Sequence, residues 1–125
     1  MEKFFSQFKT LLTLWEAIQK KDHAFTNPVT ANFERKLSEH LGVKYVIAVA
    51  SGTDALILSL KAFGIGPGDE VIVPSISAFP TAAAVRWVNA APVFVDVRTE
   101  DMNINAALIE AALTDRTKAI IPVHL

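Results

Sequence analysis

Apolar and polar residues alternate along this chain in blocks that predict strands and helices in turn. Short apolar runs rich in β-branched residues occur at 45–49, 71–73, 93–97 and 119–123, and the last strand is predicted at 118–125. Between these runs, apolar residues recur at the three- and four-residue spacing of helices. Such alternation is typical of βαβ units, in which helices cover both faces of a parallel sheet. The pattern therefore predicts an α/β fold with a mostly parallel sheet.

The helical spacing defines five segments. The first, at 4–18, carries an aromatic stripe that we interpret as core or a subunit interface. A second helix follows the turn at 26–28 and ends at Gly42, a residue suited to a helix C-terminus. The remaining helices are predicted at 54–63, 82–88 and 103–113. The segment 54–63 is apolar nearly all round, so we expect it to be buried on most sides.

Length and composition narrow the class of protein. With 125 residues, half of them hydrophobic and a fifth charged, the chain is predicted to be at most one well-packed domain. A net charge of −1 without a basic stripe argues against nucleic-acid and membrane-surface partners. The absence of cysteine excludes disulfides and thiolate chemistry, and a cytoplasmic location is expected. The three histidines are scattered, so no metal site is predicted.

The sequence Ser51-Gly52-Thr53 follows an apolar run and precedes a helical pattern. A strand that turns sharply into a helix presents free backbone N–H groups and the positive end of the helix dipole, which together hold a phosphate well. A residue without Cβ, such as Gly52, lets an anion approach closely. Alternatively, Ser51 or Thr53 only caps the helix, and the local sequence alone favours that interpretation.

A loop at 75–81 supplies three hydroxyls and one aromatic ring after a predicted strand. In open α/β sheets, ligands bind at the carboxyl ends of the strands, so a ligand role and a simple helix start are equally good interpretations here. Asp96, at the end of the next strand, could cap the following turn or contact a ligand, and the local sequence favours the cap. The patterns of dinucleotide-binding and P-loop sites are absent from the chain.

The last predicted strand is as apolar as a central strand, and no residues follow to pair its edge. Complete proteins avoid long open apolar edges because such edges promote aggregation. We therefore expect the chain to be a fragment of a longer protein.

Six segments appear in an order that is specific when taken together. They are Phe33-Glu34 with 41–43, the run 50–56, the run 66–74, Pro80-Thr81, the run 91–97 and the run 116–125. In this order they resemble the N-terminal part of the DegT/DnrJ/StrS family of pyridoxal-phosphate-dependent sugar aminotransferases. The resemblance covers residues 28–125.

The resemblance implies that residues 28–125 are the N-terminal portion of the large, cofactor-binding domain of a fold-type-I transferase. Residues 1–27 would then be an N-terminal amphipathic helix and turn. It also implies a homodimer that transfers an amino group, typically from glutamate, to a keto-sugar nucleotide. The cofactor would be pyridoxal 5′-phosphate.

The resemblance further implies roles for individual residues. Gly52 and Thr53 match the pair that binds the cofactor phosphate, and Ser51 supports them. Ala78 stands where family members usually carry an aromatic ring that stacks on the pyridine. The acid that pairs with the pyridine nitrogen and the Schiff-base lysine come after the segment matching 122–125 in the family. We therefore expect no catalytic residue in this chain and no transamination by the chain alone.

Two other functions fit the residues. The chain could be a degenerate remnant or interaction module, in which case it would self-associate through the aromatic stripe of 4–18 without affinity for the cofactor. It could also be a simple phosphate- or nucleotide-binding α/β domain, in which case nucleotides would bind at least as well as pyridoxal phosphate.

Overall fold

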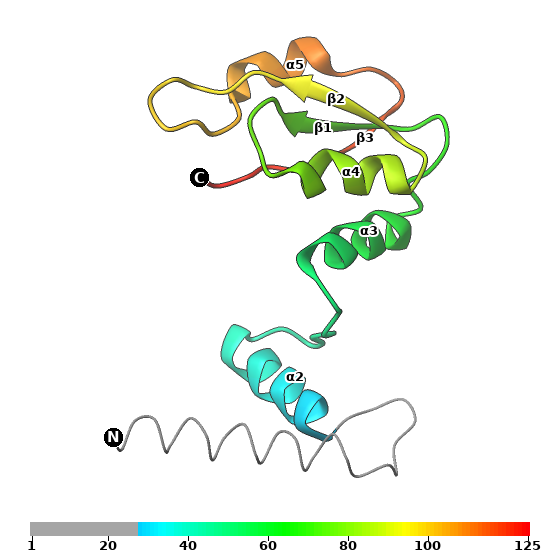
Figure 1. The fold of residues 1–125 in the computed structure, drawn as a ribbon, viewed down its shortest axis with the longest axis vertical. Helices are drawn as coiled ribbons and strands as arrows, with labels where there is room; N and C mark the ends of the chain where they lie inside the picture. The colour runs from blue at the N-terminus through cyan, green and yellow to red at the C-terminus, as the bar shows by residue number, and fades with distance from the viewer. Residues whose placement is uncertain (1–27) are drawn as a thin grey trace. The chain divides into compact units, whose positions relative to one another are not determined.

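The computed structural model describes residues 28–125, so the predicted helix at 4–18 lies outside the described residues (Figure 1). The chain divides into two compact units, residues 1–48 and 49–125. None of the described helices is long and apolar enough to cross a membrane.

The described part of the first unit is built on helix α2, Pro28–Leu41. Gly42 follows with φ of +65°, and the N–H of Val43 donates to the carbonyl of Ser38 at 3.1 Å. This left-handed residue and the bond that spans it form a Schellman end, which satisfies a carbonyl of the last turn. The predicted end of the helix at Gly42 is confirmed.

The strand predicted at 45–49 is wrong, because residues 43–49 are irregular. A strand is stable only when a neighbouring strand takes up its backbone bonds. Here the N–H of Ala48 donates instead to the carboxylate of Glu34 at 2.7 Å. Tyr45 and Ile47 remain exposed, with 73% and 79% of their surface open.

The second unit contains a parallel sheet of three strands among the described residues. The strands are β1 (Glu70–Pro74), β2 (Ala91–Val95) and β3 (Thr117–Ile120), and their order is β2-β1-β3. In the register, Ile72 of β1 pairs with Val93 and with Ile120. The predicted parallel α/β arrangement is thus confirmed. β3 is shorter than predicted because Pro122, which lacks an N–H, interrupts its continuation.

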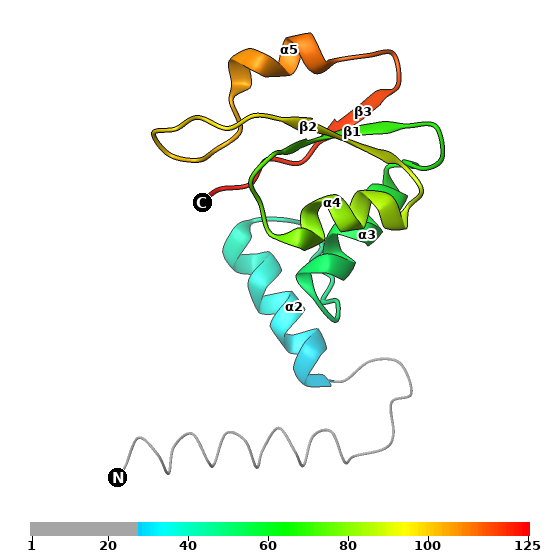
Figure 2. The ribbon, with the colours of Figure 1, turned by 45° about the horizontal axis from the view of Figure 1, so that its top comes forward.

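Helices cover both faces of this sheet. Helix α3 (Gly52–Ala62) and helix α4 (Phe79–Trp87) lie beside each other on one face, and α5 (Ile109–Ala112) lies on the other (Figures 1 and 2). A 3₁₀ turn, η1 (Ala106–Leu108), leads into α5. The alternation of side chains along β1 explains the two layers: Val71 and Val73 join the core beneath α3 and α4, whereas Ile72 is fully buried on the opposite face.

Two predictions about the helices are wrong. The predicted helix at 103–113 is broken, because Met102 has a left-handed φ of +57° and the Asn105 side chain accepts from Ala107 N to begin a new turn. Helix α3 is not buried on most sides, since only Leu60 is buried within it while Leu58 is exposed. Within its unit, α3 packs chiefly against α4, and Leu56 and Ile57 are partly buried against the core.

Candidate functional site

The carboxyl ends of the strands and the N-termini of two helices meet at one edge of the sheet (Figures 1 and 2). Helix α3 leads through residues 63–69 to the start of β1, so its N-terminus points to the opposite, carboxyl edge. Helix α4 connects the end of β1 to the start of the parallel strand β2, so its N-terminus lies at that edge too. This edge, called here the carboxyl edge, is where parallel sheets bind ligands.

Ser51 caps helix α3. Its backbone is extended, its hydroxyl accepts from the N–H of Asp54 at 3.1 Å, and it also donates to the Asp54 carboxylate at 2.9 Å. The capping interpretation is therefore correct for Ser51. Both interactions engage the Ser51 hydroxyl, and they fix the first turn of the helix.

The two N–H groups that follow are free. Within residues 28–125, the backbone N–H groups of Gly52 and Thr53 meet no acceptor, as expected for the first residues of a helix. Gly52 has no positive φ, so the backbone conformation does not require glycine there. A Cβ built at Gly52 would meet nothing within 4 Å, which means that the space in front of the helix end is open.

The electrostatics of this helix end are mixed. The dipole of the eleven-residue α3 favours an anion in front of Gly52 and Thr53. Asp54 already places a carboxylate in the first turn, held against Ser51. A bound phosphate would therefore gain from the free N–H groups and lose part of that gain to repulsion by Asp54.

The loop between β1 and α4 pairs its own hydroxyls. Ser77 Oγ and Thr81 Oγ1 lie 2.6 Å apart, and Thr81 is buried. The two hydroxyls thus pair at the start of α4, as the helix-start interpretation expects. Ala78 is the N-cap of α4, is exposed and has no side-chain cap bond, while Phe79 beside it is 84% exposed.

Asp96 joins the ends of β1 and β2. Its Oδ1 accepts from the Ser75 hydroxyl at 3.1 Å and from the N–H of Val97 at 2.9 Å. Ser75 N also donates to the carbonyl of Val95 at 2.8 Å. The Asp96 carboxylate thus engages the N–H of the next residue and not the turn at 99–101. Its bond to Ser75 could be found only once the strand order was known.

At the opposite, amino edge of the sheet, sequence reasoning missed a network around Glu70. The Thr114 hydroxyl donates to Glu70 Oε2 at 2.6 Å, and the Arg116 guanidinium donates to Oε1 at 2.9 Å from Nε. These two donors, the Thr114 hydroxyl first, lower the pKa of Glu70 below its ordinary value of 4.5. The sequence offered one signal for this network: an acid at the start of a buried strand, where a carboxylate requires hydrogen-bond donors.

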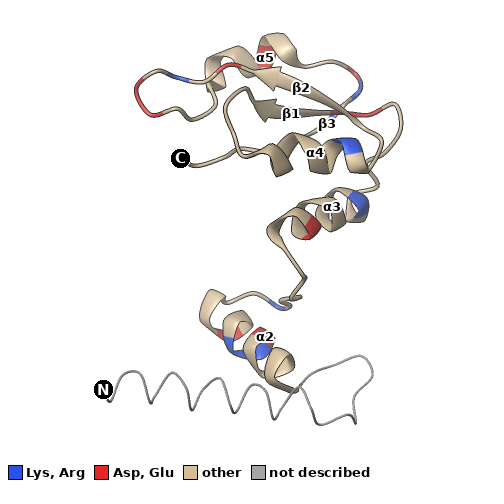
Figure 3. Cartoon of the chain, in the orientation of Figure 1, with Lys and Arg blue, Asp and Glu red and all other residues tan. Residues whose placement is uncertain are grey.

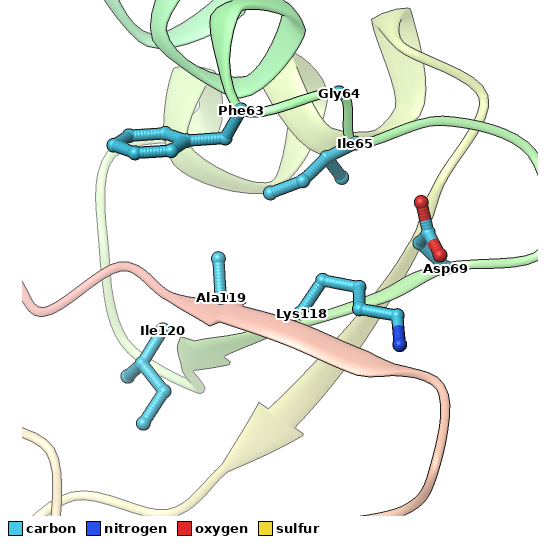
Figure 4. Close-up of a pocket in the computed structure, with 7 residues that line it drawn as sticks. All are labelled: Phe63, Gly64, Ile65, Asp69, Lys118, Ala119 and Ile120. Atoms are coloured by element: carbon cyan, nitrogen blue, oxygen red, sulfur yellow. The ribbon is translucent and has the colours of Figure 1, made fainter.

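A cavity of about 620 Å³ lies away from the carboxyl edge (Figure 4). It is lined by residues 63–65 after the C-terminus of α3, by Asp69 and by residues 118–120 of β3. The Lys118 ammonium near it donates to the carbonyl of Asp115 at 3.1 Å. Because α3 rises by about 1.5 Å per residue, the cavity and the open N-terminus of α3 are separated by roughly the length of the helix.

Charges of both signs are interspersed along the elements of each described unit (Figure 3). Lys61 lies in the last turn of α3 and Asp54 in its first, so each charge complements the helix dipole. The free N–H groups at the carboxyl edge thus attract an anion locally, without a surrounding basic surface.

Comparison with known proteins decides the family. The model of the DegT/DnrJ/EryC1/StrS aminotransferase family matches residues 8–125. The chain belongs to this family. The family predicted from the order of the sequence segments is thereby confirmed.

Among curated relatives, the chain is 60% identical over 84 residues to the UDP-N-acetyl-3-dehydro-alpha-D-glucosamine 3-aminotransferase of Acidithiobacillus ferrooxidans. It is 52% identical over 93 residues to the GDP-perosamine synthase of Caulobacter vibrioides. These matches cover 67% and 74% of the chain but only 23% and 25% of the relatives. The chain thus spans about a quarter of the length of the curated relatives it matches.

A solved structure gives the same result. The protein ntda of Bacillus subtilis, solved with bound cofactor PMP, matches with a TM-score of 0.84 and 42% identity. The match covers 92% of this chain and 26% of that one. A DegT DnrJ EryC1 StrS aminotransferase from Brucella abortus also matches, with a TM-score of 0.76 and 39% identity over 97% of this chain and 34% of that one. The described residues therefore share the fold of part of a family aminotransferase.

Proposed function

We propose that this chain supplies the phosphate-binding part of a pyridoxal-phosphate-dependent enzyme that aminates a keto-sugar nucleotide. The names of the relatives, which include a sugar aminotransferase and a perosamine synthase, support this substrate class. The amino donor would be an amino acid such as glutamate. The enzyme would work as a cytoplasmic homodimer with its active site between the subunits.

The phosphate would be held at the N-terminus of α3. The N–H groups of Gly52 and Thr53 would donate to its oxygens, and the Thr53 hydroxyl would add a third donor. Ser51 would contribute indirectly, because its two bonds to Asp54 fix the turn from which these groups project. The open space at Gly52 and the two unengaged N–H groups are the observation that carries this proposal.

Pyridoxal phosphate, when bound, supplies the electron sink that amino transfer requires. This chain's own task would be to anchor the phosphate and so fix the position of the ring. Ala78, at the N-terminus of α4, would face the ring with a methyl group, which leaves the ring without an aromatic partner from this position. Removing water and ordering the phosphate are the contributions that these residues can make.

The lysine that carries the cofactor would come from outside residues 1–125. The described lysines lie in helices α2 and α3, in the segment after α2 and in β3. Lys118, in β3, already donates to a backbone carbonyl. We therefore propose that the chain binds the cofactor through its phosphate and does not by itself transfer amino groups.

Pyridoxamine 5′-phosphate is the sharpest probe of this function, because its amine cannot condense with surface lysines. Its affinity for the whole chain is to be compared with that of pyridoxamine, which lacks the phosphate. We expect pyridoxamine to bind at least tenfold more weakly, and Thr53→Val to weaken binding of pyridoxamine 5′-phosphate several-fold. Thr99→Val, at an exposed loop position, is the matched control.

Equal affinity for the two ligands would contradict the proposal. Tighter binding of a nucleoside monophosphate than of pyridoxamine 5′-phosphate would favour the simple nucleotide-binding domain instead. Amino transfer by the purified chain, free of host enzymes, would overturn the proposed need for an external lysine.

A further inference from the structure

The segment of residues 75–78, called here the β1–α4 loop, joins β1 to α4 at the carboxyl edge (Figure 1). Hydrogen bonds hold it at both ends. At its start, the Ser75 hydroxyl donates to Asp96 Oδ1 at 3.1 Å. Near its end, Ser77 Oγ lies 2.6 Å from Oγ1 of the buried Thr81. The loop is therefore fixed to the chain after β2 and to the first turn of α4.

The bond between Ser75 and Asp96 is not needed to set the register of the sheet. The parallel pairing of β1 with β2 ends at Pro74 and Val95, and the N–H of Ser75 adds one more bond to the carbonyl of Val95 at 2.8 Å. The two side chains meet beyond these backbone bonds, and both residues are exposed. A single hydrogen bond of this kind contributes only modestly to stability. Its effect falls on the loop more than on the sheet.

The Asp96 carboxylate is held independently of the loop. Its Oδ1 also accepts from the N–H of Val97 at 2.9 Å, so the backbone after β2 orients the side chain. A carboxylate is a stronger acceptor than a neutral oxygen. Asp96 therefore offers the Ser75 hydroxyl a strong acceptor in a fixed place, and the start of the loop follows from it.

The loop ends at Ala78, the residue proposed above to face the cofactor ring. Ala78 is the N-cap of α4 without a side-chain cap bond, and its carbonyl accepts from the N–H of Thr81 at 3.1 Å. A methyl group offers a ring far less contact than an aromatic side chain does. The orientation of the ring then depends on the backbone that carries this methyl group, which is the backbone of the β1–α4 loop.

We propose that Asp96 is a positioning residue for the cofactor ring and acts through Ser75 on the β1–α4 loop. The inference rests on the proposed function and deepens it by dividing the cofactor between two elements. The N-terminus of α3 holds the phosphate, and the loop before α4 orients the ring. A loop that is fixed before binding loses less conformational freedom when the ligand arrives, so the ring is bound more tightly.

Titrations of the whole chain with pyridoxamine 5′-phosphate and with inorganic phosphate test this role. Ser75→Ala and Asp96→Ala each remove the bond between the two side chains, and Ser75→Ala does so without changing the net charge. We expect each variant to weaken binding of pyridoxamine 5′-phosphate about fivefold, the worth of one hydrogen bond. Binding of inorganic phosphate should stay as in the wild type, because this ligand has no ring to orient.

Two further variants serve as controls. Asp96→Asn keeps an oxygen acceptor for the Ser75 hydroxyl and should restore nearly the wild-type affinity. Thr99→Val, at an exposed position in the loop after β2, should leave both affinities unchanged.

Induced circular dichroism in the absorption band of the bound ring gives a second readout. A ring held in one orientation by the protein produces a strong band. We expect this band to shrink in Ser75→Ala and Asp96→Ala at saturating ligand and to persist in Asp96→Asn. Dichroism of the backbone checks that each variant is folded, and either alanine variant carries the test if the other is not.

The possible outcomes separate the inference from the proposed function. Equal losses of affinity for pyridoxamine 5′-phosphate and for inorganic phosphate would assign Ser75 and Asp96 a structural role and overturn the positioning role. Wild-type affinity and an unchanged ring band in both alanine variants would overturn it as well, with the phosphate site still in place. A wild-type chain that does not bind pyridoxamine 5′-phosphate would overturn the proposed function and this inference together.

Discussion

The two edges of the sheet treat their polar groups in opposite ways. At the amino edge, the Glu70 carboxylate is buried and accepts from Thr114 and Arg116. At the carboxyl edge, the N–H groups of Gly52 and Thr53 meet no acceptor within the described residues. Polar groups that pair within the chain stabilise the fold, whereas those left open can bind a ligand. On this difference rests the proposal that a phosphate binds at the carboxyl edge and not in the cavity beside β3.

The largest effect is expected from a side chain that blocks the free N–H groups at the carboxyl edge. Gly52→Val places a branched side chain in the space before the helix end, so affinity for pyridoxamine 5′-phosphate should fall more than tenfold. Folding should survive, because a Cβ at this position meets no neighbouring atom within 4 Å. Isothermal titration calorimetry measures the affinity.

Gly66→Ala is the control for the steric argument. A Cβ there would lie 3.8 Å from the Val88 carbonyl, an ordinary contact, and Gly66 belongs to the turn before β1. Its affinity for pyridoxamine 5′-phosphate should equal that of the wild type. A similar loss of affinity in both variants would mean that the substitutions weaken binding by destabilising the fold, and not by blocking the helix end.

The next prediction concerns the Glu70 network at the amino edge. The folded-state pKa of Glu70 is lowered, so its ionised form stabilises the fold at pH values above the ordinary 4.5. This contribution should be lost as the pH falls from 4.5 through the folded-state pKa. Glu70→Gln should therefore lower the melting temperature at neutral pH, with the difference from wild type shrinking in acid.

Differential scanning calorimetry from neutral pH to below 4.5 follows that difference. Glu100→Gln, at an exposed turn position, is the control and should leave the melting temperature nearly unchanged at every pH. A deficit in Glu70→Gln that stays constant down to the acid limit would contradict the assigned role of the ionised carboxylate.

A smaller effect is expected from removing the Ser51 cap of helix α3. Ser51→Ala removes the acceptor for Asp54 N and should cost about 1 kcal/mol of unfolding free energy. Urea denaturation measures it, and Ser59→Ala, at an exposed site within α3, should cost less than half as much. If the two variants were equally stable, the hydroxyl of Ser51 would be free for a direct ligand role.

The smallest effect is expected from removing the repulsion between Asp54 and a bound phosphate at the carboxyl edge. Asp54→Asn keeps an acceptor for the Ser51 hydroxyl and removes the negative charge of the first turn. Affinity for pyridoxamine 5′-phosphate should rise about threefold at low salt, and the gain should shrink in high salt. Fluorescence titration of the ligand at two ionic strengths checks this. An unchanged affinity at low salt would place the phosphate elsewhere.

The sequence predicted those elements whose signals are local. The parallel strands around 71–73 and 93–97 and the end of α2 at Gly42 are confirmed, because apolar runs and a left-handed glycine depend on few neighbours. The strand at 45–49 is wrong, because strand formation requires a partner that the described chain does not provide.

The same distinction between local signals and long-range contacts applies to the candidate site. The cap at Ser51 and the open N–H groups behind it could be predicted, since any helix start leaves such groups. The Ser75–Asp96 bond could not, because the two residues are 21 positions apart and meet only when β1 and β2 are neighbours. The same holds for Glu70, whose partners lie 44 and 46 residues later.

Amide NMR of the isotope-labelled chain, titrated with pyridoxamine 5′-phosphate, tests the central claim most directly. An amide proton that donates to a phosphate oxygen moves downfield, so the account predicts the largest saturable downfield shifts at Gly52 and Thr53. Pyridoxamine should leave both signals in place. Saturable binding that moves neither amide, or that moves instead the signals of Lys118 and Ala119 beside the cavity, would contradict the assignment of the phosphate to the N-terminus of α3.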